Sequence, residues 1–208
     1  DKVLDSLNAK RYEDAIPEEL NDVYDKDAYE KSQAYKKTNH RFGNLTSLFS
    51  IVLTISFFFL DGFSFVDEFA RSYTDNSILV ALVFFGIIMI GSDIITTPFS
   101  YYKTFVIEEK FGFNKSTKKI FFLDKLKGWL MSAIIGGGIL AIIIWFYEFS
   151  GKSFWIYAWA IVSVFSLLMN MFYSKLIVPL FNKQTPLEDG ELKTAITKYA
   201  TSVGFKLN

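Results

Sequence analysis

Residues 104–114 read TFVIEEKFGFN, a charged and aromatic stretch with one glycine that lies between long apolar segments. Two apolar segments precede it, at 42–60 and 76–92, and two follow it, at 128–147 and 153–174. A helix rises about 1.5 Å per residue and a bilayer core is about 30 Å thick, so about 20 residues cross it. The sequence predicts an all-α polytopic membrane protein with four spans and residues 104–114 in the loop between the second and third.

The composition agrees with a membrane protein. Of 208 residues, 51% are hydrophobic and 18% aromatic, which is high for a soluble chain of this length. The 22 basic and 22 acidic residues give a net charge of zero, which argues against nucleic-acid binding.

The loop charges orient the predicted spans. The loop at 61–77 carries four carboxylates and only Arg71 as a base, whereas the loop at 96–127 carries seven lysines and three carboxylates. Basic loops favour the cytoplasmic side. We therefore expect the loop 96–127 and both chain ends to be cytoplasmic, and the acidic loop to lie on the opposite side.

Three regions follow from this pattern. Residues 1–41 form a cytoplasmic helical lead with a helix start predicted at PEEL, 17–20; residues 42–174 form the four-span membrane region. Residues 175–208 are expected to begin a cytoplasmic domain that continues beyond Asn208. In that region TPLE, 185–188, has the pattern of a capping box, and Gly204 is expected to end an amphipathic helix. Cytoplasmic amphipathic helices are thus predicted at both ends.

Residues suited to catalysis or metal binding are scarce. The chain has no cysteine and a single histidine, His40, so an H-E-x-x-H zinc motif cannot be built from it. Glu108 and Glu109 are adjacent and diverge in direction, so we interpret them as ionic anchors of the loop, with Lys110, rather than as an acid–base pair. We therefore predict no catalytic, cofactor-binding or metal-binding residue in this chain.

Two polar residues in the apolar segments are functional candidates. Asp93 lies late in the second span, five residues before Pro98, where the apolar pattern is expected to break. A carboxylate within a membrane is costly, but one near the interface or a wet cavity costs less, and the structural interpretation is favoured. Asn170, in the fourth span, is interpreted as an interhelical hydrogen bonder or a cavity-lining residue.

The motifs, taken in order, resemble those of one family. TFVIEEKFGFN, together with PEEL at 17–20, YEKS at 29–32, IYAW at 156–159, PLF at 179–181, TPL at 185–187 and ELK at 191–193, resembles the Ste24-type CAAX prenyl proteases, integral-membrane zinc metalloproteases of the M48 class. The resemblance covers nearly the whole chain, and the eleven-residue stretch is its most specific part.

The resemblance implies that this chain is the N-terminal, chamber-forming membrane part of such a protease. In the family one further span precedes the region resembling Asp1, and the H-E-x-x-H helix lies beyond the region resembling Asn208. Zn²⁺ would thus be bound by a downstream zinc domain and not by this chain, which alone would be inactive. The implied substrates are prenylated CAAX proteins or membrane proteins, and the implied location is the bacterial inner membrane or the endoplasmic reticulum.

The sequence also fits a second function. A four-span transporter subunit or membrane scaffold, with Asp93 and Asn170 lining a path, explains the apolar segments equally well. It does not explain the TFVIEEKFGFN stretch.

Overall fold

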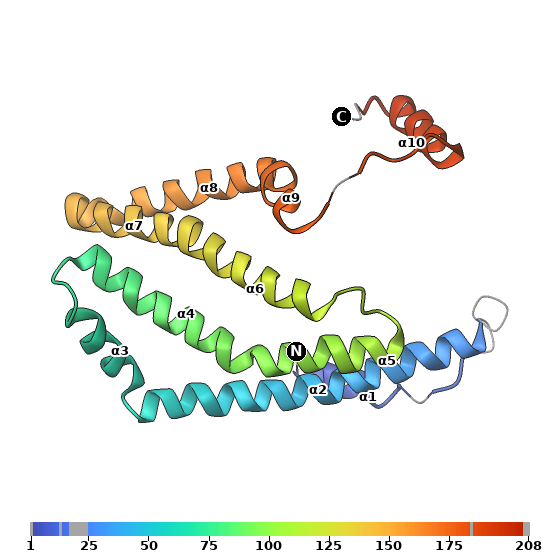
Figure 1. The fold of residues 1–208 in the computed structure, drawn as a ribbon, viewed down its shortest axis with the longest axis horizontal. Helices are drawn as coiled ribbons and strands as arrows, with labels where there is room; N and C mark the ends of the chain where they lie inside the picture. The colour runs from blue at the N-terminus through green and yellow to red at the C-terminus, as the bar shows by residue number, and fades with distance from the viewer. Residues whose placement is uncertain (1, 13, 17–24, 184, 206–208) are drawn as a thin grey trace. The chain divides into compact units, whose positions relative to one another are not determined.

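The computed structural model describes residues 2–12, 14–16, 25–183 and 185–205. The helix start expected at 17–20 lies outside these residues. The described part is helical, with no strand, in agreement with the all-α prediction. The chain divides into two units, Asp1–Phe154 and Trp155–Asn208, which are considered separately. The first begins with the short helix α1, Lys2–Ala9 (Figure 1).

Helix α2, Lys26–Phe59, joins the predicted polar lead to the first apolar segment. It begins at Asp25, whose carboxylate accepts a 2.8 Å hydrogen bond from the backbone N–H of Ala28. Its 34 residues run without interruption across residue 41. At about 1.5 Å per residue, such a helix is about 51 Å long, which exceeds the bilayer core of about 30 Å. The polar N-terminal half of α2 therefore continues the helix outside the length that a membrane would cover.

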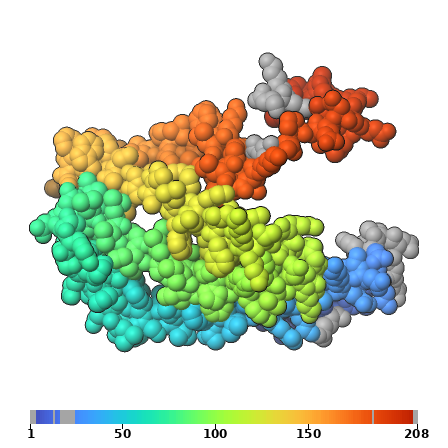
Figure 2. All heavy atoms as spheres, viewed as in Figure 1, coloured from blue at the N-terminus to red at the C-terminus, as the bar shows by residue number. Residues whose placement is uncertain are grey.

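The expected loop 61–77 is mostly helix α3, Gly62–Arg71. Asp61 precedes it with a left-handed φ of 52°, which reverses the chain after α2. Val66 and Ala70, four residues apart, lie on one buried face of α3, which packs against α4. In the space-filling view the end of α2, α3 and the start of α4 form one continuous surface, in cyan to green (Figure 2).

Helix α4, Ser77–Tyr102, begins at Asn76, whose side-chain oxygen accepts from the N–H of Leu79 at 3.1 Å. The sequence predicts a break near Pro98, but Pro98 lies inside α4, which continues to Tyr102. The chain continues as a π-helix, η2, Lys103–Glu108, and then as α5, Glu109–Phe111.

The predicted loop at 104–114 is therefore wrong over most of its length, because residues 104–111 are helical. Gly112 ends the helix with φ 78°, a left-handed conformation that glycine adopts without steric cost. The N–H of Phe113 then donates to the carbonyl of Glu108 at 2.8 Å, which satisfies an end carbonyl of the helix. The glycine was a helix stop rather than a sign of an irregular loop.

The second half of the expected loop 96–127 is also helical. Helix α6, Lys118–Met131, begins at Thr117 and is followed by a π-helix, η3, Ser132–Gly136, and by α7, Gly137–Ser150. Helix α7 packs against α4, where a Cβ added to Gly137 would lie 3.5 Å from the side chain of Leu82. A short 3-10 helix, η4, Gly151–Ser153, follows α7.

The second unit contains α8, Phe154–Leu176, then α9, Val178–Phe181, and α10, Glu191–Ser202. The capping box expected at 185–188 does not start α10, which begins after Gly190. Asp189 instead pairs with Lys193 at 2.7 Å across the first turn. Gly204 ends the helix with φ 71°, as expected, and Phe205 N–H donates to the carbonyl of Ala200.

Within the described residues, three helical stretches are long and apolar enough to cross a membrane: Lys26–Phe59, Ser77–Phe111 and Lys118–Leu176. The third has 59 residues and includes η4, with Gly151 at φ 54°. Few side chains in the described part are buried against the protein itself. All of them are apolar: Val66, Ala70, Val80, Ile107, Phe111 and Ala200. The outward-facing apolar helices identify an integral membrane protein.

Candidate functional site

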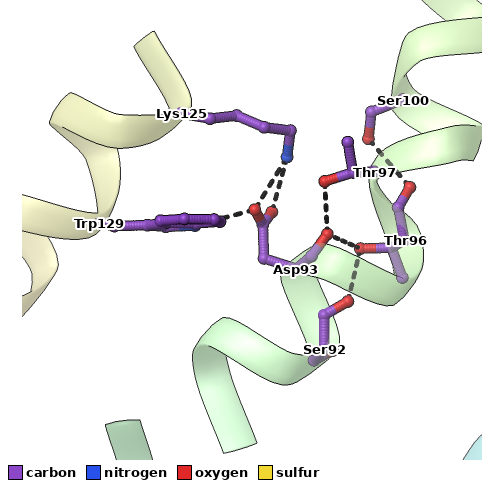
Figure 3. Close-up of polar contacts among 7 residues, drawn as sticks. All are labelled: Ser92, Asp93, Thr96, Thr97, Ser100, Lys125 and Trp129. Carbon is purple, nitrogen blue, oxygen red and sulfur yellow. Dashed lines mark hydrogen bonds and ion pairs between the residues drawn. The ribbon is translucent and has the colours of Figure 1, made fainter. Parts of the chain in front are cut away.

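Asp93, the carboxylate within the apolar α4, is paired with two side chains of α6 (Figure 3). Lys125 Nζ lies 2.8 Å from Asp93 Oδ1 and 2.9 Å from Oδ2. The indole N–H of Trp129 donates to Oδ2 at 2.9 Å. We call Asp93, Lys125 and Trp129 the Asp93 site.

Helix geometry explains how two side chains of α6 reach the same carboxylate. Lys125 and Trp129 are four residues apart, so they lie on one face of that helix. The Lys125 ammonium also lies 5.7 Å from the ring centre of Phe121, one turn earlier on the same face. The side chains of Lys125 and Asp93 are 18% and 34% exposed, so much of the ion pair is withdrawn from solvent.

The α4 backbone around Asp93 is held by hydroxyl groups. Thr97 Oγ1 donates to the carbonyl of Asp93 at 2.6 Å, and Thr96 Oγ1 donates to that of Ser92 at 2.8 Å (Figure 3). Pro98 has no N–H to donate to the preceding turn, and such side-chain bonds to carbonyls accompany bends in helices. The turn of α4 between Asp93 and Pro98 thus carries two hydroxyl-to-carbonyl bonds, from Thr96 and Thr97.

The Asp93 site is suited to fixing α4 against α6. Both carboxylate oxygens accept hydrogen bonds from side chains of α6, and charge-assisted bonds of this kind are short and strong, so the geometry is that of a cross-link between two helices. The sequence pointed to Asp93 but missed Lys125 and Trp129. The signal in the sequence is the spacing of four between Lys125 and Trp129, which indicates one helix face only if residue 125 is helical and not in the predicted loop 96–127.

The other sequence candidates do not join this site. Asn170 donates to the carbonyl of Ser166 at 3.1 Å, one turn back on its own helix. His40 Nε2 lies 3.0 Å from Asn44 Nδ2, also on the same helix. In the described part of the chain, no three His, Asp or Glu side chains come together in a way that could hold a metal ion. These residues do not fit a zinc site.

The TFVIEEKFGFN stretch forms a second cluster, which joins the end of the α4–α5 helix to the polar half of α2. Tyr35 of α2 donates its hydroxyl to Glu108 Oε1 at 2.8 Å. Its ring meets those of Phe111 and Phe113 edge-on, at centroid distances of 5.2 and 4.8 Å. Phe111 is only 6% exposed. We call Tyr35, Glu108, Phe111 and Phe113 the Glu108 junction.

The Glu108 junction revises the expected role of the two glutamates. The hydrogen bonds of the structure give both a neutral partner: Glu108 accepts from Tyr35, and Glu109 Oε2 accepts from the side-chain amide of Asn114 at 2.7 Å. Lys110 lies over the ring of Phe111, 5.6 Å from its centre. Glu108 thus ties the stretch to α2 by a hydrogen bond from a tyrosine, whereas Glu109 accepts from an asparagine within the stretch itself, and neither contact is the ionic one that the sequence predicts.

Comparison with known proteins places this arrangement in a family. A family model described as the CAAX prenyl protease N-terminal region, with five membrane helices, matches residues 5–183. That number differs from the three candidate spans found by length and composition and from the four expected from the sequence.

Individual relatives and a solved structure agree with the family model. A CAAX prenyl protease 1 homolog of Arabidopsis thaliana is 36% identical over 199 residues, which cover 92% of this chain and 47% of that protein. A probable CAAX prenyl protease 1 of Schizosaccharomyces pombe is 35% identical over 92% of this chain and 43% of that protein. The crystal structure of S. mikatae Ste24p matches with a TM-score of 0.92 and 31% identity, over 99% of this chain and 49% of that chain.

This chain therefore spans a little less than half the length of the relatives it matches. The match nevertheless includes both the α4–α6 region that carries the Asp93 site and the TFVIEEKFGFN stretch that suggested the family. From its helices, its sequence and its fold, the chain belongs to the CAAX prenyl protease N-terminal family.

Proposed function

We propose that this chain is the N-terminal membrane part of a zinc metalloendopeptidase of the CAAX prenyl protease type, and that it forms walls of an intramembrane chamber. The observation that carries this proposal is the likeness to S. mikatae Ste24p, which extends over 99% of this chain at a TM-score of 0.92. The zinc site would come from a downstream domain, because the described residues offer no fitting set of ligands. This chain alone would be inactive.

In this role the two clusters hold helices rather than react with substrate. The Asp93 site fixes α4 against α6 in the apolar region, and the Glu108 junction fixes α2 against the far end of the same helix. Helix α4 also contacts α3 and α7, so it is the common wall element of the first unit. A rigid wall preserves the position of a substrate and of the downstream domain relative to each other.

We also propose the topology that the loop charges suggest. The third candidate stretch, 59 residues, would be about 88 Å long as one straight helix, almost three times the thickness of a bilayer core. Counting its parts before and after η4 separately gives four spans. Residues 1–41 and 175–208, with the region 96–127, would then be cytoplasmic around the membrane region 42–174, in the bacterial inner membrane or the endoplasmic reticulum.

The substrates would be prenylated CAAX-type proteins or membrane proteins, and the further partners would be the bilayer and the downstream zinc domain. The alternative of a transporter subunit or scaffold lacks the support that the relatives give to a protease.

Cleavage of a prenylated CAAX peptide by the full-length protein distinguishes a protease from a transporter subunit or scaffold. We expect cleavage that a zinc chelator abolishes and added Zn²⁺ restores, and no cleavage by residues 1–208 alone. Chelator-resistant cleavage, or cleavage by the 208-residue chain, contradicts the assignment.

The topology has its own test, which the absence of cysteine from residues 1–208 simplifies. Glu68→Cys in α3 and Lys118→Cys at the start of α6 place single thiols at two exposed positions. In sealed vesicles an impermeant maleimide should label them from opposite sides. Labelling of both from the same side contradicts the proposed topology and leaves the protease assignment standing.

A further inference from the structure

An open groove lies between α2 and the α4–η2 helix. Its volume is about 560 Å³, within the range of about 300–1,000 Å³ typical of ligand pockets. Most of its lining is apolar or aromatic, including Phe42, Leu45, Phe99 and Tyr102, and one cation, Arg41, lines it as well. Neither the Asp93 site nor the Glu108 junction contributes a charged group to it.

The backbone of α4 and η2 shapes one wall of the groove. Pro98 and Tyr102, four residues apart, line it together with Ile107. A regular α-helix would bring residue 105 or 106 onto this face, and the π-helix, with its wider turn, brings Ile107 there instead. Ile107 is 3% exposed, so it forms a closed apolar base. The π-helix thus shapes this wall of the groove by placing Ile107 on the same face as Pro98 and Tyr102.

The groove lies where both helices change from polar to apolar. Arg41 is the last charged residue of α2, and Lys103 is the first after Asp93 on α4 and η2. Phe42 stacks on Tyr102, with ring centres 5.4 Å apart and planes at 25°, so the two boundaries lie at the same height. Cations flanked by aromatic rings at the end of an apolar helix are typical of the membrane interface.

Arg41 has a guanidinium available for a ligand. Its side chain is exposed, and it takes part in none of the hydrogen bonds or ion pairs formed among the residues that the structure describes. Guanidinium groups bind phosphate oxygens through two parallel hydrogen bonds. A phosphate at Arg41 would lie at the headgroup level, directly beside the apolar groove.

We propose that this groove binds an anionic phospholipid, with its phosphate at Arg41 and an acyl chain along Phe42, Leu45 and Phe99. An extended peptide fits less well, because the apolar lining offers few partners for its backbone N–H and carbonyl groups. A zwitterionic lipid would fill the groove but lacks the net charge that complements Arg41. The proposal concerns lipid binding and does not depend on the proteolytic activity proposed above.

The test is lipid retention by the full-length protein. The protein is equilibrated with an equimolar mixture of phosphatidylserine and phosphatidylcholine of the same acyl chains, and bound lipid is counted by native mass spectrometry. We expect preferential retention of phosphatidylserine by the unmodified protein. Arg41→Gln should lower that preference about five-fold, the effect of about 1 kcal/mol per basic residue near a lipid surface.

Lys36→Gln is the matched control. Lys36 is an exposed cation on the same polar half of α2 but lies five residues from Arg41, about 140° around the helix, and does not line the groove. This variant should keep the preference for phosphatidylserine. Equal losses in Arg41→Gln and Lys36→Gln would reduce the effect to general surface charge and overturn the proposal.

Two further arms test the acyl chain. Leu45→Trp places a larger side chain in the groove without changing charge and should lower the retention of both lipids. Glycerophosphoserine, the headgroup without chains, should not displace bound phosphatidylserine. Full displacement by the headgroup alone, or retention unchanged in both Arg41→Gln and Leu45→Trp, would show that no lipid occupies this groove.

Discussion

The Asp93 site and the Glu108 junction both tie a carboxylate of the α4–α5 helix to a neighbouring helix, but by different means. Asp93 meets an ammonium and an indole N–H, and the two charged side chains carry most of the contact. Glu108 meets a phenol, and the surrounding contact is between aromatic rings. The first is a charge pair in an apolar region, and the second is apolar packing with one hydrogen bond.

This difference predicts where each cluster is vulnerable. Removing one member of a partly buried ion pair leaves an uncompensated charge, so the penalty comes from the partner that remains. Removing a buried ring leaves a cavity, so the penalty scales with lost volume. The Glu108 junction should therefore respond most to truncation of Phe111, and the Asp93 site to neutralisation of one charge only.

Phe111→Ala should have the largest effect. A Phe→Ala change in a protein interior lowers the free energy of unfolding by about 3–5 kcal/mol, and Phe111 is 6% exposed. We expect a loss of about 3 kcal/mol, measured by denaturing the full-length protein in mixed micelles. Phe113→Ala is the control, because Phe113 touches the same tyrosine but is 54% exposed. Equal losses from the two variants would contradict a packed junction.

Lys125→Met should rank second. It leaves Asp93 with the indole N–H of Trp129 as its remaining side-chain donor in the Asp93 site. A fully buried pair broken in this way loses about 3–5 kcal/mol; the exposed fractions of 18% and 34% reduce our expectation to about 2 kcal/mol. The double variant Asp93→Asn with Lys125→Met should recover part of this loss. A double variant as unstable as the sum of the single variants would show that the two charges are not coupled.

The apolar half of this architecture could be predicted from sequence, because a continuous apolar run of about 20 residues has the length of a membrane-spanning helix, which satisfies its own backbone hydrogen bonds. The two clusters could not. Lys125 is 32 residues from Asp93, and nothing in the local pattern reveals which residues on another helix a carboxylate will meet. The glycine and charges of residues 104–114 resemble a loop, yet contacts of Phe111 and Glu108 with Tyr35 stabilise a helix there.

The same reasoning explains why α4 continues through Pro98 and why α2 is continuous across residue 41. A proline usually marks the end of a helix, but neighbouring segments can stabilise a helix around it in membrane proteins, and α4 continues through Pro98 while packing against α3 and α7. The polar residues 26–41 lack glycine and proline, so α2 extends through them once the apolar half has formed. The resemblance to the family is confirmed although the loop prediction at 104–114 is wrong, because the resemblance depends on residue identity and not on the predicted secondary structure.

Tyr35→Phe should have a smaller effect than either variant above. It removes the donor to Glu108 and keeps the ring that contacts Phe111 and Phe113. A hydrogen bond to a charged group contributes about 1.5–3 kcal/mol to the free energy of unfolding, and the partial exposure of this one reduces our expectation to about 1 kcal/mol. Glu108→Gln, which keeps an oxygen acceptor, should lose less. A loss from Tyr35→Phe as large as that from Phe111→Ala would mean that the hydrogen bond, and not packing, holds the junction.

Asp67→Asn should have the smallest effect, although Asp67 and Arg71 form an ion pair as short as that of Asp93. The Asp67–Arg71 distance is 2.7 Å, and that between Asp93 and Lys125 is 2.8 Å. The exposed fractions differ: 41% and 64% for Asp67 and Arg71, against 34% and 18% for Asp93 and Lys125. Water and salt screen the exposed pair, and holding two mobile side chains together costs conformational entropy.

We therefore expect almost no change in the unfolding midpoint for Asp67→Asn. Any small loss from this variant should disappear at 1 M salt, where the loss from Lys125→Met should persist. If the two variants lost stability equally and with the same salt dependence, distance rather than withdrawal from solvent would set the strength of these pairs, and the contrast between the Asp93 site and a surface ion pair would fail.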